Sequence, residues 1–191
     1  MTEEWNDLVR ERMRKADEVR RRGRNPYTND QQVGGTTADA IRAAEGKDLE
    51  KEEIRVDIAG RVVAARNFGK AAFLVIADRA GKLQVYLKRD RIGEEEYTLF
   101  RETMDIGDIV WVEGPLFLTR TGELTIQAER LRLLTKSLRP LPEKWHGLSD
   151  VETRYRQRYV DLIVNDGVRD LFRRRSLFDH QSRVIGKPIV F

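Results

Sequence analysis

The residues whose chemistry is easiest to interpret lie on two short segments, 71–77 (AAFLVIA) and 82–87 (KLQVYL), which flank a DRAG turn. Alternating side chains on both sides of such a turn predict a β-hairpin. If the first and last turn residues lie opposite each other, Phe73 pairs with Tyr86, and Gln84 shares their face of the sheet. Aromatic rings stack on nucleobases and amides bond base edges, so this face predicts a platform for single-stranded nucleic acid.

The same register places the aliphatic residues of both segments on the opposite face, where they predict a core: Leu74, Ile76, Leu83 and Val85. Lys82 adds a cation to the open face. A second interpretation of that face needs no ligand, because an aromatic pair also stabilises neighbouring strands on a solvated surface. The hairpin alone leaves both interpretations open.

A second group of residues suited to nucleic acid is an arginine cluster at the end of a predicted helix. Apolar residues recur at helical spacing from 3 to 22, and Gly23 marks the helix end. The cluster comprises Arg20, Arg21, Arg22 and Arg24. Cations at this position complement the helix dipole, and they are also suited to phosphate contacts, so two interpretations stay open.

Composition excludes several classes of site. The chain of 191 residues is 40% hydrophobic and 36% charged with a formal net charge of +4, which permits a folded core and a mildly basic surface. It has no cysteine, and His146 and His180 are too far apart to predict a metal centre. P-loop, GxSxG and HExxH motifs are absent, so we predict no catalytic residues and no metal ligands.

Membrane segments are not predicted. The amino-terminal residues MTEEWNDLVRERMRK lack the apolar core of a secretory signal, and the longest apolar run, 71–77, is too short to span a bilayer. We therefore expect a cytoplasmic protein without a membrane partner.

The order of the predicted elements indicates the scaffold that carries these residues. Strands are predicted at 55–65, 71–77, 82–87, 109–118 and 123–134, with a helix at 94–104. Gly114-Pro115 predicts a bulge or kink in the fourth strand. This order predicts a mainly β protein with helices, built on a five-stranded Greek-key barrel of the OB type, whose second and third strands carry the oligonucleotide-binding face.

Helical segments are predicted on both sides of the barrel. A capped short helix runs from Thr36 to about Glu45, and a stiff RPLP linker at 139–142 follows the barrel. Further helices are predicted at 151–164 and 168–184, separated by Asn-Asp-Gly. The chain then divides into a helical extension at 1–50, the barrel at 51–137 and linker helices at 138–191.

Several segments carry a family resemblance: AGR at 59–61, RNFGKAAF at 66–73, KLQVY at 82–86, GD at 107–108, TRTGEL at 119–124 and LRPLPEKWHGLSDVETRYRQRYVDLI at 138–163. Together they resemble the amino-terminal part of the bacterial lysyl-tRNA synthetases, class II enzymes with an OB-fold anticodon-binding domain. The last segment distinguishes the lysine-specific members from the aspartyl and asparaginyl enzymes. The resemblance covers residues 1 to about 177.

The resemblance implies that the barrel binds tRNA(Lys) and recognises a uridine-rich anticodon. By position in the family motifs, Phe73 stacks on a base, Gln84 and Glu123 recognise base edges, and Arg66 contacts a base or a phosphate. The expected contacts to the tRNA backbone are Lys70, Lys82, Arg20, Arg21, Arg22 and Arg24. Members of the family are homodimers that use ATP and magnesium.

The sequence departs from the family after Leu177. Phe172, Arg175 and Ser176 match the start of the first class II motif, but the second and third motifs, which hold ATP and lysine, do not follow. We therefore expect a truncated or frame-shifted product or a fragment that binds no cofactor and forms no lysyl-adenylate by itself. Dimerisation of this chain is left open.

Two other functions compete with anticodon binding. One is a free-standing OB-fold protein that binds single-stranded nucleic acid with little sequence preference. The other is a protein that offers a dimerisation or docking surface through the helix at 150–164 and binds no RNA.

Overall fold

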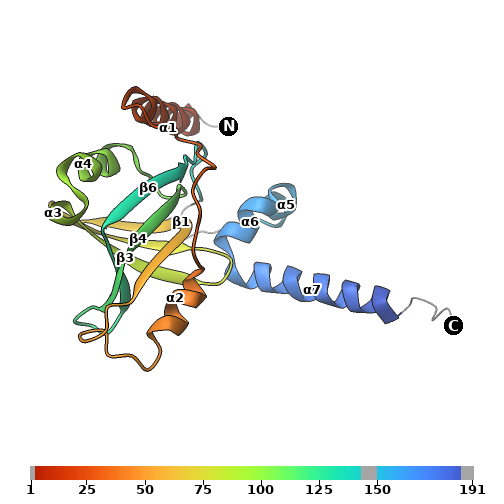
Figure 1. Cartoon of the computed structure of the whole chain (residues 1–191). Helices are drawn as coiled ribbons and strands as arrows, with labels where there is room; N and C mark the ends of the chain where they lie inside the picture. The colour runs from red at the N-terminus through yellow and green to blue at the C-terminus, as the bar shows by residue number, and fades with distance from the viewer. Residues whose placement is uncertain (1–2, 143–149, 186–191) are drawn as a thin grey trace. The chain divides into compact units, whose positions relative to one another are not determined.

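The computed structural model describes residues 3–142 and 150–185 of the chain. The chain forms two compact units, Met1–Pro140 and Leu141–Phe191 (Figure 1). The first unit contains a β-barrel together with the helices that precede it. The second unit is helical where it is described.

The described residues form a barrel from β1 (Arg55–Asn67), β2 (Ala71–Ala77), β3 (Lys82–Lys88), β4 (Ile109–Leu118), β5 (Leu124–Ala128) and β6 (Arg130–Thr135). The strand order is β1-β2-β3-β5-β4-β6, and β1 also pairs with β4, which closes the sheet (Figure 1). Among these pairs only β3 with β5 is parallel. The predicted OB-type barrel is confirmed, with β5 and β6 as the halves of its bent fifth strand.

The bend in the fifth strand lies opposite Gly114. β5 pairs with β3 and β4, whereas β4 is the one named strand that pairs with β6, and Glu129 separates the two halves. The sequence placed the irregularity in β4 itself, yet the pairing of β4 with β1 is regular through Gly114. A Cβ atom on Gly114 would lie 2.0 Å from the Gln127 carbonyl oxygen, so glycine is required because the opposite strand approaches so closely.

Side chains alternate along β2 and β3 as the sequence predicts. Phe73 pairs with Tyr86 and Val75 with Gln84. The inward residues of this hairpin are buried and join apolar residues from the other strands in one core: Leu74, Ile76, Leu83, Val85, Ile58, Val62, Val110, Val112 and Ile126. The hairpin therefore has one core face and one open face.

The helices of the first unit lie close to their predicted positions. α1 (Glu3–Arg21) packs against α4 (Glu94–Thr103), which leads from the short, unpredicted α3 (Arg89–Ile92) to β4. α2 (Thr37–Ala44) begins at the predicted cap, where Thr36 and Asp39 form a capping box. Thr37 donates from its backbone nitrogen and its hydroxyl to Asp78, both at 2.7 Å, which fixes α2 to the turn between β2 and β3.

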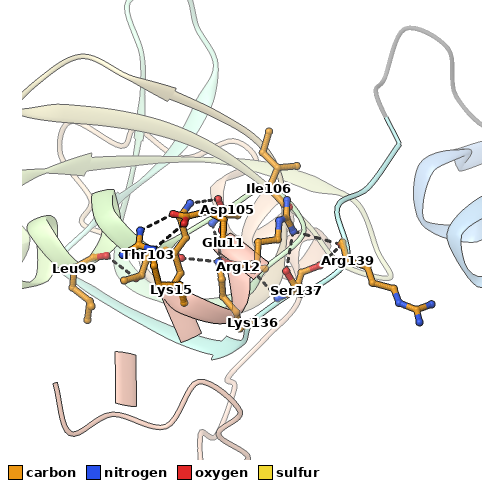
Figure 2. Close-up of polar contacts among 12 residues, drawn as sticks. Glu11, Arg12, Lys15, Leu99, Thr103, Asp105, Ile106, Lys136, Ser137 and Arg139 are labelled. Atoms are coloured by element: carbon orange, nitrogen blue, oxygen red, sulfur yellow. Dashed lines mark hydrogen bonds and ion pairs between the residues drawn. The ribbon is translucent and has the colours of Figure 1, made fainter. Parts of the chain in front are cut away.

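A buried polar network joins α1 to the end of the barrel (Figure 2). The ammonium of Lys136, whose side chain is fully buried, donates to Asp105 Oδ2 at 2.6 Å, to Asp108 Oδ2 at 2.8 Å and to the Thr103 carbonyl at 2.6 Å. Lys15 of α1 donates to Asp105 Oδ1 at 2.6 Å. The charges of two carboxylates and two ammonium groups therefore balance one another where the last strand ends.

Arg12 of α1 extends this connection to the segment that follows β6 (Figure 2). Its guanidinium donates to the carbonyl of Ser137 at 2.9 Å and to the carbonyl of Ile106 at 3.1 Å. The backbone nitrogen of Ser137 donates to Asp108 Oδ1 at 2.8 Å. The course of the chain directly after the barrel is therefore held by a side chain of the amino-terminal helix.

The second unit contains α5 (Val151–Arg156), α6 (Arg158–Val164) and α7 (Asp166–Ile185). The single helix predicted at 151–164 is wrong, because Gln157 adopts φ −118° and ψ 52° and interrupts it. The break predicted at Asn-Asp-Gly is confined to Asn165, and the last helix starts at Asp166. Residues 143–149, part of the longest segment behind the family resemblance, lie outside the described residues.

Within residues 3–142 and 150–185, no helix has both the length and the apolar composition that a membrane span requires. The same residues contain no group of side chains that could hold a metal ion.

Candidate nucleic-acid interface

The open face of the barrel is formed by β2, β3 and β5. The antiparallel register places Phe73 beside Tyr86, and the parallel register of β3 with β5 places Thr125 beside Gln84. Residues paired across a sheet share a face, and every second residue of a strand returns to it. The face predicted from the hairpin is therefore present, and it extends onto a third strand.

A row of aromatic rings crosses this face. Phe68, from the turn between β1 and β2, lies 6.1 Å from Phe73 between ring centroids, and the rings are nearly perpendicular at 84°. Phe73 lies 4.8 Å from Tyr86, and Tyr86 lies 6.2 Å from Phe117 of β4. Phe68 is 63% exposed. Rings at these separations form a continuous aromatic surface of the kind on which unpaired bases stack.

The amide of Gln84 is held at both ends. Its Nε2 donates to Glu123 Oε2 at 2.7 Å, and its Oε1 accepts from the Thr125 hydroxyl at 2.9 Å. An amide has two N–H donors and an oxygen with two lone pairs, so each end keeps one further position for a ligand. Gln84 therefore presents a donor and an acceptor in fixed places beside the aromatic row.

Cations lie at the borders of the same face. Arg66 of β1 is exposed and pairs with Phe73 across the two strands. Lys70 and Lys82 are exposed at opposite ends of the β2–β3 hairpin. The structure thus brings together the base-contacting residues predicted from the sequence: Arg66, Phe73, Gln84 and Glu123.

Comparison with known proteins agrees with this geometry. The family described as "OB-fold nucleic acid binding domain" matches residues 56–134, which span the barrel. The lysine–tRNA ligase of Anaeromyxobacter sp. (strain K) is 49% identical over 175 residues, which are 89% of this chain and 34% of that protein. This chain is a homologue of the lysine–tRNA ligases.

Other lysine–tRNA ligases match over the same extent. The ligase of Dechloromonas aromatica is 50% identical over 174 residues, and that of Magnetococcus marinus is 46% identical over 177 residues. These matches cover 90% and 91% of this chain but 34% and 35% of the two ligases. The chain therefore spans about a third of the length of the curated relatives that it matches, and the predicted family is confirmed.

In this lysine–tRNA ligase homologue, the arginine cluster at the end of α1 divides into two pairs. Arg20 bonds Asp17 at 2.6 Å and Arg21 bonds Glu18 at 2.9 Å, both within α1 and largely exposed. Arg22 also contacts Glu102, and Arg24 contacts Glu96; both carboxylates belong to α4. Arg22 and Arg24 therefore help to fix α1 on α4, whereas the ion pairs of Arg20 and Arg21 are weak surface pairs. The Arg20 guanidinium also lies over the Tyr27 ring, 5.9 Å from its centroid.

Sequence reasoning missed Phe68, Phe117 and Thr125. The two-residue alternation from Glu123 along β5 would have placed Thr125 on the face of Glu123. It would not have placed either residue beside Gln84, because the parallel pairing of β3 with β5 joins residues about 40 positions apart and leaves no local signal. Phe68 precedes a turn glycine, and only its exposure beside Phe73 marks it as part of the face.

Proposed function

We propose that this chain binds the anticodon of lysine tRNA through the open face of β2, β3 and β5. The observation that carries the proposal is the fixed amide of Gln84 next to the aromatic row that begins at Phe68. A base stacked on that row has its edge within reach of one donor and one acceptor. Uridine matches such a pair, because its N3–H donates and its neighbouring carbonyl oxygens accept.

The bordering cations supply a second part of binding. Arg66, Lys70 and Lys82 attract the phosphate backbone without distinguishing among bases. The aromatic row also tolerates every base, because each base has a face on which to stack. Discrimination is therefore assigned to Gln84 and Glu123, and affinity to the rings and cations.

We further propose that the chain supplies the tRNA-binding part of lysine–tRNA ligation in the cytoplasm. The ATP, magnesium and lysine sites of that reaction would belong to the second and third class II motifs rather than to the barrel. Sequence-indifferent binding by a free-standing OB protein is not favoured, because the similarity to lysine–tRNA ligases continues beyond the barrel over 175 residues.

Equilibrium binding of two anticodon stem-loops tests the proposal. One stem-loop carries the uridine-rich lysine anticodon and the other has cytidine in place of its central uridine, at one stated salt concentration. We expect the uridine loop to bind about tenfold more tightly, because the wrong edge leaves polar groups of the site unpaired. Gln84→Ala should reduce this preference, and equal affinities for the unmodified chain would instead indicate a non-specific OB protein.

A further inference from the structure

Two neighbours determine which way the Gln84 amide faces. An ionised carboxylate only accepts hydrogen bonds, so Glu123 holds the Nε2 end of the amide at 2.7 Å. The Thr125 hydroxyl donates to the Oε1 end at 2.9 Å. Reversing the amide would turn its oxygen toward the carboxylate. The Thr125 hydroxyl would then lose its bond to Gln84 Oε1 and would have to donate its single hydrogen to the Glu123 carbonyl oxygen, 3.1 Å away.

Thr125 lies where it acts on Gln84 and not on a ligand. Thr125 has 0% exposure and lies in β5, directly opposite Gln84 in the parallel register. Its hydroxyl also lies 3.1 Å from the Glu123 carbonyl oxygen. Because Thr125 is closed to solvent, a base bound on the open face does not contact this hydroxyl.

The direction of the amide has a chemical consequence for pyrimidines. Uridine presents a donor at N3 beside an acceptor at position 4, whereas cytosine presents an acceptor at N3 beside an amino donor. An amide turned by 180° exchanges its own donor and acceptor. An amide that is free to turn therefore accommodates both bases, and a fixed amide accommodates one.

We propose that Thr125 is a positioning residue for anticodon recognition, which holds the Gln84 amide in the orientation that selects uridine over cytosine. This inference rests on the proposed function, because it concerns the residue that the proposal assigns to base recognition. The determinants of specificity then include a buried hydroxyl that does not itself contact the RNA.

The test compares the ratio of dissociation constants for the uridine and cytidine stem-loops in the full chain and its variants. Thr125→Val keeps the shape of the side chain and removes the hydroxyl, so we expect the ratio to fall roughly fivefold, the worth of one hydrogen bond. Thr125→Ser restores the hydroxyl and should restore the ratio. Thr103→Val is the matched control, since Thr103 is also buried and its hydroxyl donates to the Leu99 carbonyl in α4.

Each outcome separates this inference from the proposed function. A chain that binds both stem-loops equally before any substitution overturns the proposed function and the inference with it. A uridine preference that survives Thr125→Val overturns only the positioning role. Equal losses in Thr125→Val, Thr125→Ser and Thr103→Val would show a general effect of altering the core and would also overturn it.

Discussion

Gln84 and Phe73 lie on neighbouring strands, and the proposed function gives them different physical roles. The Phe73 ring lies against Tyr86 and offers contact area for stacking. The Gln84 amide is hydrogen-bonded at both ends and offers a donor and an acceptor in fixed positions. Stacking depends on contact area and tolerates any base, while hydrogen bonds to an edge depend on placement. Substitutions at the two residues should therefore affect different measurements.

Phe73→Ala should weaken binding of the lysine anticodon stem-loop by about 1 to 3 kcal/mol, the usual contribution of one base stack. The loss should be similar for the uridine and cytidine loops, because stacking is sequence-tolerant. Fluorescence titration of labelled stem-loops measures both affinities, and circular dichroism checks that the barrel remains folded. Phe178→Ala, at an exposed position in α7, is the control and should bind like the unmodified chain. Unchanged affinity of Phe73→Ala would contradict the role of the aromatic row.

At the scale of elements, the attachment of α1 depends on the Lys136 network. Lys136→Met should lower the free energy of unfolding by about 3 to 5 kcal/mol, because it leaves the buried carboxylate of Asp108 without its nearest cation. Urea unfolding at pH 7 measures the loss. Lys51→Met is a matched control, since Lys51 forms an exposed pair with Asp48 and should change stability by less than about 0.5 kcal/mol.

A second substitution separates loss of the pair from loss of packing. Adding Asp108→Asn to Lys136→Met removes the uncompensated charge, so the double variant should be less destabilised than Lys136→Met alone. A double variant that is destabilised by the sum of both single changes would contradict the charge-compensation account.

The same network makes stability depend on pH. Burial acts to raise the pKa of Asp105, but hydrogen bonds from Lys136 and Lys15 outweigh it and lower that pKa below the usual 3.8. The stability that Asp105 contributes is therefore present above pH 3.8 and is lost as the pH falls toward its folded pKa. Asp108 acts in the opposite direction, because burial raises its pKa despite Lys136.

Asp105→Asn removes the first of these contributions. As the pH falls below about 3.8, the variant should therefore lose less stability than the unmodified chain. Thermal unfolding followed across that range provides the measurement. Parallel stability curves for the two proteins would show that Asp105 is not the titrating group.

The elements that could be predicted from the sequence are those with a local signal. Two-residue alternation and turn composition predicted the register of β2 and β3 and the face shared by Phe73 and Gln84. The Thr36 capping box predicted the start of α2. The interruption at Gln157 left no such signal, because apolar residues recur at helical spacing on both sides of it.

The parts of the site that were not predicted depend on pairing between distant segments. Thr125 was missed, and Glu123 was indicated by the family resemblance and not by any local pattern. Both meet Gln84 through the parallel pairing of β3 with β5, at separations of 41 and 39 residues. The Lys136 network joins α1 to residues 90 positions further along the chain, through Lys15 and Asp105. Only the closed barrel brings these groups together, so their chemistry follows from topology and not from spacing.

At the scale of the whole molecule, charge should govern affinity without governing choice of base. Replacing Arg20 and Arg21 together by glutamate should reduce affinity for both stem-loops and for unrelated tRNAs alike. It should also lower the magnitude of the salt slope, the slope of the logarithm of the binding constant against the logarithm of the salt concentration, by roughly 1 to 2. Their ion pairs with Asp17 and Glu18 are exposed and weak, so both arginines should readily exchange these carboxylates for phosphate groups of the RNA. Titrations at several salt concentrations measure the slope. An unchanged slope would instead favour the interpretation that the two arginines complement the dipole at the end of α1.

The claim that the open barrel face binds the anticodon is tested most directly by nuclear magnetic resonance. The measurement is a titration of the isotopically labelled chain with the lysine anticodon stem-loop, following backbone and side-chain amide signals. The account predicts that the largest shifts fall on Phe73, Tyr86 and Thr125 and on the side-chain amide of Gln84. Shifts confined to α1 or to α5, α6 and α7, with the Gln84 side-chain signals unmoved, would contradict it.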